Sequence, residues 1–245
     1  MKIFGLLGKN IDYSFSRGYF KSKFENNNLD CSYINFDIES IEEFKKLKEN
    51  SQKLAGLNVT IPYKELVIPY LDSLEKEAKE IGAVNTIKIE NNQLIGYNTD
   101  HYGFRESLIP LLEPHHKSAL ILGTGGASKA VAYALKELGI QFEYVSRTKT
   151  AQVKYSYSTL PAVAMDTYKI IVNCTPLGTF PEIEKCPNIP YEKLSKKHLL
   201  FDLIYNPSET QFLKNGKAKQ SKTINGLEML KIQAEKSWEI WNSNK

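Results

Sequence analysis

The stretch S-A-L-I-L-G-T-G-G-A-S-K-A-V-A-Y-A-L-K-E-L-G, residues 118–139, decides the fold of this chain. It combines an apolar run, a glycine-rich turn and a helical repeat of apolar residues that Gly139 ends. Further apolar runs follow at 142–145, 168–174 and 199–205. Strands without polar alternation are typical of parallel sheets buried on both faces. Residues 102–225 are therefore predicted to form a doubly wound parallel sheet.

The turn of this stretch has the spacing of a dinucleotide-binding loop between a strand and a helix. Gly123 permits the tight turn, Gly125 lets the backbone approach a pyrophosphate, and the amides at the helix start face its charge. Ser128 replaces the third glycine of G-x-G-x-x-G, so a glycine turn without a ligand is the alternative. The predicted cofactor contacts of the loop are Gly123, Thr124, Gly125, Gly126, Ala127 and Ser128.

Ser146, Arg147 and Thr148 follow the second predicted strand of this sheet. A fold that selects NAD usually carries an acidic residue there to hold the ribose 2′-hydroxyl. A guanidinium instead pairs with a 2′-phosphate, and a hydroxyl can donate to it. The sequence therefore favours NADP(H) over NAD(H), with a solvated Arg147 as the alternative.

The first hundred residues alternate between strand and helix patterns, which predicts an α/β sheet. The turn residues N-N-Q, 91–93, indicate a hairpin. Leu227, Leu230, Ala234, Trp238 and Trp241 repeat at helical spacing, so the C-terminal helix needs an apolar partner surface. The predicted strands are 2–7, 32–37, 54–61, 83–90 and 93–98, and the predicted helices are 18–26, 41–49, 63–71 and 73–81.

The composition excludes several classes of protein. The chain has 245 residues, 42% hydrophobic and 24% charged, enough for one large or two small domains. Its net charge of +4 is spread over lysines interleaved with glutamates, which argues against nucleic acid as a partner. The chain has no apolar run of about 20 residues and no signal-peptide pattern, so we expect a cytoplasmic protein without a membrane contact.

No metal or disulfide is expected. Cys31, Cys174 and Cys186 lack C-x-x-C spacing. His115 and His116 read as a solvated pair in a loop.

Nine motifs, in order along almost the full length, resemble the shikimate dehydrogenase family. The resemblance implies NADPH-linked reduction of 3-dehydroshikimate to shikimate, a step toward aromatic amino acids. It also implies a substrate domain (1–101), a Rossmann cofactor domain (102–225) and a C-terminal helix (226–245) that packs back on the first domain. The motifs are Y-S-F-S (13–16), N-V-T-I-P-Y-K (58–64), G-A-V-N-T (82–86), G-Y-N-T-D (96–100), G-T-G-G-A-S (123–128), S-R-T (146–148), N-C-T-P-L-G (173–178), Y-N-P (205–207) and G-L-x-M-L-x-x-Q (226–233).

The resemblance also implies roles for single residues. Lys64 and Asp100 match the family's catalytic pair, and the chemistry agrees: an ammonium stabilises an alkoxide and donates a proton, and a nearby carboxylate keeps it charged. Each of these residues has a structural alternative. Lys64 could be an ordinary surface lysine, and Ser14 and Ser16 could be turn or cap residues. Asn85 could be a strand-end hydrogen-bonding residue, and Gln233 a partly exposed helix residue. The implied substrate contacts are Ser14, Ser16, Asn58, Thr60, Asn85 and Gln233, and further implied cofactor contacts are Thr175, Leu203, Tyr205 and Gly226.

Three features depart from the family pattern. Y-S-F-S-R-G-Y-F keeps both serines but lacks the usual proline and histidines, and it adds Arg17. Thr179 and Phe180 follow N-C-T-P-L-G, where methionine is usual. The region after Ser146 is short, and we expect its helix to be reduced to residues 151–160.

Three rival functions stay open. They are a family member for quinate or NAD, a binding protein without turnover, and methylenetetrahydrofolate dehydrogenase, which G-Y-N-T-D and the C-terminal glutamine do not suit. Retention of Lys64 and Asp100 argues against a mere binder, which needs no proton donor. The oligomeric state, monomer or homodimer, is left open.

Overall fold

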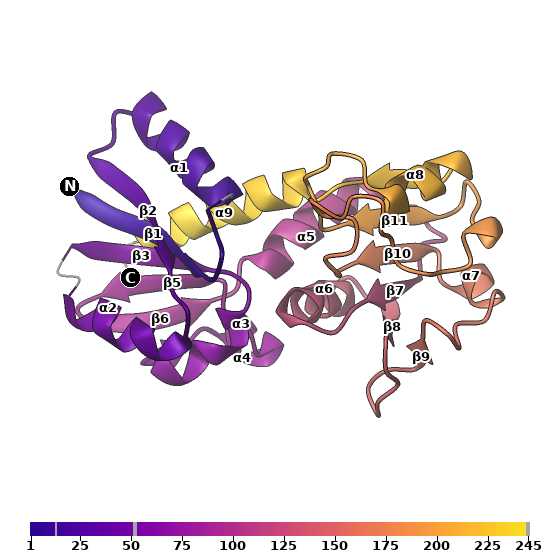
Figure 1. Ribbon diagram of the computed structural model, residues 1–245, viewed down its shortest axis with the longest axis horizontal. Helices are drawn as coiled ribbons and strands as arrows, with labels where there is room; N and C mark the ends of the chain where they lie inside the picture. The colour runs from indigo at the N-terminus through magenta and orange to yellow at the C-terminus, as the bar shows by residue number, and fades with distance from the viewer. Residues whose placement is uncertain (13, 51–52, 244–245) are drawn as a thin grey trace. The chain divides into compact units, whose positions relative to one another are not determined.

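The structure is a computed structural model that describes residues 1–12, 14–50 and 53–243. It divides into two compact units, Met1–Thr99 with Gln233–Lys245, and Asp100–Ile232. Each unit is built around a six-stranded sheet (Figure 1). The assignment of these units to substrate and cofactor stays a prediction.

The first sheet is mixed, with strand order β2-β1-β3-β5-β6-β4. β1 runs parallel to β2 and β3, whereas β5 runs antiparallel to β3 and β6. The hairpin between β5 and β6 is confirmed, and Asn91 and Asn92 adopt the positive φ angles, 51° and 62°, that a tight hairpin turn requires. The strands are β1 Lys2–Gly8, β2 Cys31–Asp37, β3 Leu54–Val59, β4 Ser73–Leu74, β5 Thr86–Glu90 and β6 Gln93–Tyr97.

Helices cover both faces of this sheet (Figure 1). Along β1, Phe4 and Leu6 pack toward α1 and the end of α9, and Leu7 packs into the cluster that includes residues of α2 and α4. Trp241 of α9 stacks on Phe4 with ring centroids 4.8 Å apart. The C-terminal helix thus has the apolar partner surface that its sequence requires. The helices are α1 Phe15–Asn26, α2 Phe44–Asn50, α3 Tyr63–Leu66, α4 Lys76–Ile81 and α9 Leu227–Asn242, with 3₁₀ turns at Ile41–Glu43 and Ile68–Tyr70.

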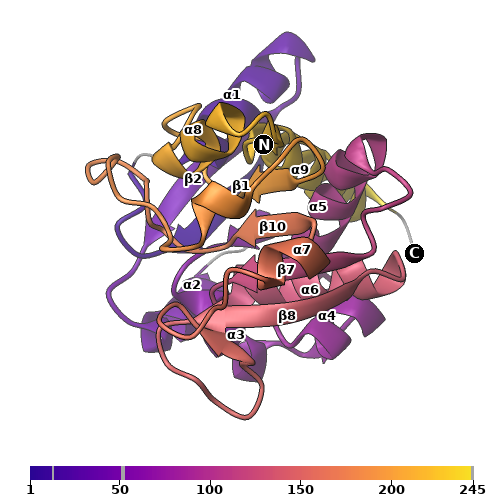
Figure 2. The same ribbon diagram turned by 90° about the vertical axis from the view of Figure 1, so that its right-hand side faces the viewer.

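The second sheet is parallel throughout, in the order β12-β11-β10-β7-β8-β9, which confirms the predicted doubly wound sheet. The turned view shows β10, β7 and β8 in this order (Figure 2). The elements are β7 Ser118–Leu122, β8 Gln141–Ser146, β9 Tyr155–Ser156, β10 Ile170–Asn173, β11 Leu199–Asp202, β12 Lys222–Ile224, α5 Asp100–Leu108, α6 Gly126–Glu137, α7 Ala164–Thr167 and α8 Gln211–Ala218, with 3₁₀ turns at Ile109–Leu111 and Tyr191–Lys193.

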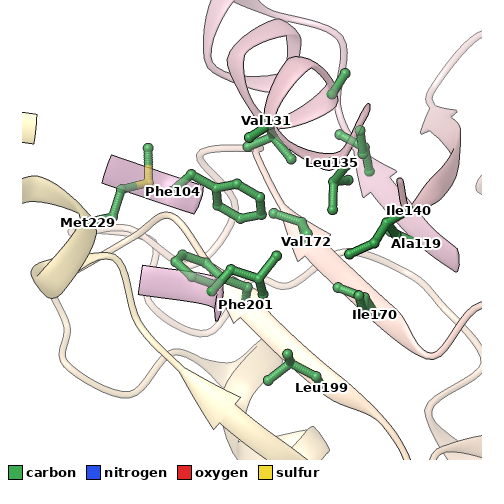
Figure 3. Packing of buried hydrophobic residues seen from close by; sticks show 14 residues of the cluster. Phe104, Ala119, Val131, Leu135, Ile140, Ile170, Val172, Leu199, Phe201 and Met229 are labelled. Atoms are coloured by element: carbon green, nitrogen blue, oxygen red, sulfur yellow. The ribbon is translucent and has the colours of Figure 1, made fainter. Parts of the chain in front are cut away.

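Strands of the second sheet are buried on both faces, as their continuous apolar runs predict. On β7, Ala119 and Ile121 face the cluster that includes Phe104 of α5 and Val131 of α6 (Figure 3). Leu120 and Leu122 face the opposite cluster, which includes residues of α7 and α8. This double burial holds the carboxyl ends of the strands in fixed positions.

Three predictions about local structure are wrong. Residues 151–160 are not helical but contain β9, because Ser156 pairs with Ser146 and its hydroxyl bonds Thr159, a local contact that competes with a helix. Ser73 and Leu74 form β4 instead of a helix. His116 is not solvated: it is 4% exposed, its Nδ1 accepts from the backbone N–H of Glu113, and burial lowers its pKa.

None of the described helices is long and apolar enough to cross a membrane.

Candidate active site

The end of β3 leads directly into the short helix that carries Lys64. The backbone N–H of Tyr63 donates to the carbonyl of Thr60 at 2.9 Å, which closes the turn. The Tyr63 hydroxyl is buried and donates to the carbonyl of Ile38 at 2.7 Å. The carbonyl of Lys64 accepts from the N–H of Val84 at 2.7 Å. Lys64 is half-buried, and its backbone is therefore hydrogen-bonded to Val84, the residue that precedes Asn85.

Asn85 and Gln233 meet in the interior of the first unit. Nδ2 of Asn85 donates to Oε1 of Gln233 at 3.2 Å, and Oδ1 of Asn85 accepts from the backbone N–H of Thr99 at 2.6 Å. Both amide side chains are buried. Gln233 is thus not the partly exposed helix residue that was the alternative. The contact also fixes the backbone immediately before Asp100.

Asn58 is buried among protein groups of the same unit. Its Oδ1 accepts from the Tyr33 hydroxyl at 2.8 Å, and its Nδ2 lies 3.0 Å from the Ser237 hydroxyl and 3.3 Å from the carbonyl of Asn85. These bonds support the residues around the predicted site. A direct contact of Asn58 with a substrate stays a prediction, as does that of the half-buried Thr60.

Ser14 and Ser16 lie at the start of α1. Ser14 is the N-cap, and its Oγ accepts from the backbone N–H of Ser16 at 3.2 Å. Ser16 is buried. Arg17 is exposed. Tyr13, the first residue of the same motif, lies outside the described residues.

Asp100 is the first residue of α5 and is 5% exposed. It belongs to the second unit, whereas Lys64 belongs to the first. The pairing of these two groups stays a prediction.

The glycine loop of the second unit has the backbone that its sequence predicts. Gly123 has a φ angle of 107°, which favours glycine, and Gly125 is the N-cap of α6. A Cβ atom added at Gly125 would meet no heavy atom within 4 Å, so its backbone is open to a bound group. Ser128, which replaces the third glycine, is fully buried and its hydroxyl donates to the carbonyl of Gly125 at 2.6 Å. The serine therefore stabilises the turn rather than disrupting it. Thr124 is exposed, and Gly126 and Ala127 are half-buried at the start of the helix.

Ser146, the last residue of β8, is half-buried, and Arg147 and Thr148 are exposed just beyond it. A cation at this strand end, beside an open glycine turn at a helix N-terminus, fits the phosphates of a dinucleotide.

The ends of β10 and β11 are joined by a buried carboxylate. Asp202 accepts from Nδ2 of Asn173 at 3.0 Å, from the N–H of Ile204 at 3.1 Å and from the Thr210 hydroxyl at 2.5 Å. Burial raises the pKa of Asp202 to about 6. Asn173 in turn accepts from the N–H and the hydroxyl of Thr175 at 3.0 and 2.7 Å. Asp202 thereby positions the loop that follows β10.

Three further predicted cofactor contacts lie near this loop. Gly226 donates its N–H to the carbonyl of Ile204 at 3.0 Å, and a Cβ atom there would lie 2.1 Å from the carbonyl oxygen of Leu203. Because any side chain at position 226 would clash with this carbonyl oxygen, the position requires glycine. Tyr205 is half-buried, as is Leu203, and Phe180, which follows the loop, is 73% exposed.

Sequence patterns did not identify Tyr33, Thr86, Thr99, Asp202 and Ser237 as site residues. Thr86 and Thr99 lie inside two of the family-like motifs, and Asp202 ends an apolar strand, so these three positions carry a usable signal in the sequence. Tyr33 and Ser237 look like ordinary strand and helix residues.

Within the described residues, no group of three or more His, Cys, Asp or Glu side chains is placed to hold a metal ion.

Comparison with known proteins gives a consistent result. Residues 6–87 match the family model of the shikimate dehydrogenase substrate binding domain. The NADP(+) shikimate dehydrogenase of Clostridium beijerinckii is 39% identical over 253 residues, covering 98% of this chain and 92% of the relative.

Two solved structures are similar over nearly the whole chain. The shikimate 5-dehydrogenase of Thermus thermophilus, in complex with NADP(H) and shikimate, has a TM-score of 0.88 at 33% identity and covers 99% of this chain and 94% of that chain. The quinate dehydrogenase of Corynebacterium glutamicum, in complex with NAD, has a TM-score of 0.87 at 26% identity. The match covers 98% of this chain and 93% of that chain.

Proposed function

The chain belongs to the shikimate dehydrogenase family, and we propose that it catalyses the reversible NADPH-dependent reduction of 3-dehydroshikimate to shikimate. The observation that carries the proposal is the 39% identity to an NADP(+) shikimate dehydrogenase over 98% of the chain. The buried polar cluster of Asn85, Thr99 and Gln233 supports it, because a polyol acid requires several fixed hydrogen-bonding groups.

The second unit is the proposed site of NADP(H). When bound, NADPH supplies the hydride that reaches the carbonyl carbon of the substrate. The backbone amides at the start of α6 are proposed to hold the pyrophosphate, since the open turn at Gly125 leaves room beside them. Arg147 is proposed to pair with the 2′-phosphate, which a carboxylate at that position would repel.

Lys64 is the proposed proton donor. As hydride reaches the carbon, the ketone oxygen develops negative charge, which an ammonium stabilises and then protonates. Asp100 is proposed to keep the ammonium charged and oriented. In the reverse direction a neutral Lys64 must act as the base, so shikimate oxidation should be faster at high pH.

The proposed substrate contacts are hydroxyl and amide groups of the first unit. Ser14 and Ser16 are assigned to the substrate carboxylate, and Thr60, Asn85 and Gln233 to its hydroxyls and carboxylate. Asn58 supports this set through its bonds to Tyr33 and to the backbone of Asn85. The cytoplasmic location and the choice between monomer and homodimer stay predictions.

A second candidate is the oxidation of quinate, with either cofactor. Two observations favour testing it: the exposed Arg17 beside the proposed carboxylate site, and the similarity to a quinate dehydrogenase solved with NAD.

One experiment separates these candidates. The kcat/KM of the purified protein is measured for shikimate and for quinate, each with NADP⁺ and with NAD⁺, by the absorbance of the reduced nicotinamide. We expect the highest value for shikimate with NADP⁺. A higher value for quinate or NAD⁺ would favour the second candidate, and no turnover with any pair would favour a binding protein.

A further inference from the structure

A single hydroxyl group, that of Ser237, lies where four groups of the first unit meet. Its Oγ lies 3.0 Å from Nδ2 of Asn58, 2.8 Å from the Thr86 hydroxyl and 3.2 Å from the Thr99 hydroxyl. It also donates to the carbonyl of Gln233, one helical turn earlier, at 2.9 Å. Ser237 is 0% exposed. It lies on the buried face of α9, one turn after the buried Gln233 and between Ala234 and Trp238 of the apolar cluster.

The hydrogen bonds continue from Ser237 to Tyr33 of β2. Asn58 bonds Ser237 through Nδ2 and the Tyr33 hydroxyl through Oδ1. A series of buried hydrogen bonds therefore connects Tyr33 of β2, through Asn58, with Ser237 and the carbonyl of Gln233.

The hydrogen-bond donors of this cluster fix the orientation of the side-chain amides of Asn85 and Gln233. The N–H of Thr99 can only donate, so the atom of Asn85 that faces it at 2.6 Å is the oxygen. Nδ2 of Asn85 then faces Gln233, and the atom of Gln233 that accepts from it is Oε1. Oε1 is therefore the end of the Gln233 amide that faces Asn85, and the donor group Nε2 is the opposite end.

We infer that Ser237 and Tyr33 are positioning residues, which hold Asn58, Asn85 and Gln233 in the one arrangement that binds the substrate. Neither is assigned to the substrate or the cofactor. Buried polar groups that satisfy one another specify a single arrangement, because any other leaves a buried donor or acceptor unpaired. The inference rests on the proposed function for the identity of the substrate, but the coupling between the residues does not depend on it.

The coupling is tested without substrate. Hydrogen exchange of the side-chain amides of Asn85 and Gln233 is followed by NMR in the wild type, in Ser237→Ala and in Ser107→Ala. Ser107 is the matched control, since it is also a buried helical serine whose hydroxyl donates to the carbonyl four residues earlier, Gly103. We expect exchange at least about tenfold faster in Ser237→Ala only. Equal rates in all three proteins would overturn the inference.

The consequence for binding is tested with the KM values for shikimate and NADP⁺. We expect Ser237→Ala and Tyr33→Phe to raise the KM for shikimate about three- to tenfold, with that for NADP⁺ unchanged, whereas Ser107→Ala changes neither. Tyr33→Phe is the second variant because it keeps the ring that stacks on Phe20 and removes only the hydroxyl.

The outcomes separate the two proposals. An unchanged KM for shikimate in both variants overturns the positioning role. A wild type that does not oxidise shikimate contradicts the proposed function alone, and the exchange rates then decide on the coupling.

Discussion

Asn85 and Gln233 lie 148 residues apart in the chain, yet Nδ2 of Asn85 donates to Oε1 of Gln233 at 3.2 Å in the interior of the first unit. This contact exists because α9 carries the chain back to the sheet with which it began. Trp241 anchors the end of that helix, as its Nε1 donates to the carbonyl of Ile87 at 3.0 Å. The proposed substrate site therefore depends on the packing of α9 as well as on its polar residues.

The packing of α9 on the sheet is tested by two glycine substitutions. A Cβ atom at Gly56 would lie 2.3 Å from Nε1 of Trp241, so Gly56→Ala must displace this ring. We expect it to lower the free energy of unfolding by about 1–3 kcal/mol, measured by urea denaturation. Gly18→Ala is the control, since nothing lies within 4 Å of its Cβ position in α1 and alanine should raise the free energy of unfolding by about 0.5–1 kcal/mol. Equal effects of the two substitutions would be inconsistent with this packing.

Cofactor selection is tested at Arg147. Arg147→Asp places a carboxylate where we propose the 2′-phosphate, so the KM for NADPH should rise at least about tenfold while that for NADH changes far less. Lys196→Asp is the matched control, because Lys196 is an exposed cation of the same unit outside the proposed site. If both KM values rise equally in Arg147→Asp, Arg147 does not bind the 2′-phosphate.

The buried carboxylate of Asp202 predicts a pH dependence of stability. Burial raises its pKa in the folded state from the ordinary 3.8 to about 6, so the folded protein binds more protons than the unfolded chain between these pH values. The free energy of unfolding contributed by Asp202 therefore falls as the pH rises through this window. The Asp202→Asn variant keeps the shape of the side chain but cannot titrate.

This prediction is measured by urea denaturation of both proteins at pH 4.5 and pH 7. The stability of the wild type relative to Asp202→Asn should fall by about 2 kcal/mol between these pH values. A difference that does not change with pH would show that Asp202 does not titrate in this way.

Much of this architecture follows from patterns of the sequence. Continuous apolar runs predicted the buried parallel strands, and the glycine-rich loop predicted the tight turn at Gly123. The 151–160 prediction failed because the hydroxyls of Ser156 and Thr159 bond each other instead of leaving the backbone to a helix. Ser237 and Tyr33 could not be predicted from local patterns, because their importance arises from partners up to 179 residues away.

The central claim is that this chain transfers hydride between NADP(H) and shikimate with Lys64 as the proton-transferring group. Its most direct test is the kcat of shikimate oxidation with saturating NADP⁺, for the wild type and for Lys64→Ala. We expect the wild type to produce NADPH and Lys64→Ala to lose at least about a hundredfold in kcat, with a much smaller change in shikimate affinity. A wild type that produces no NADPH from shikimate, or a Lys64→Ala variant with near-normal kcat, would contradict this account.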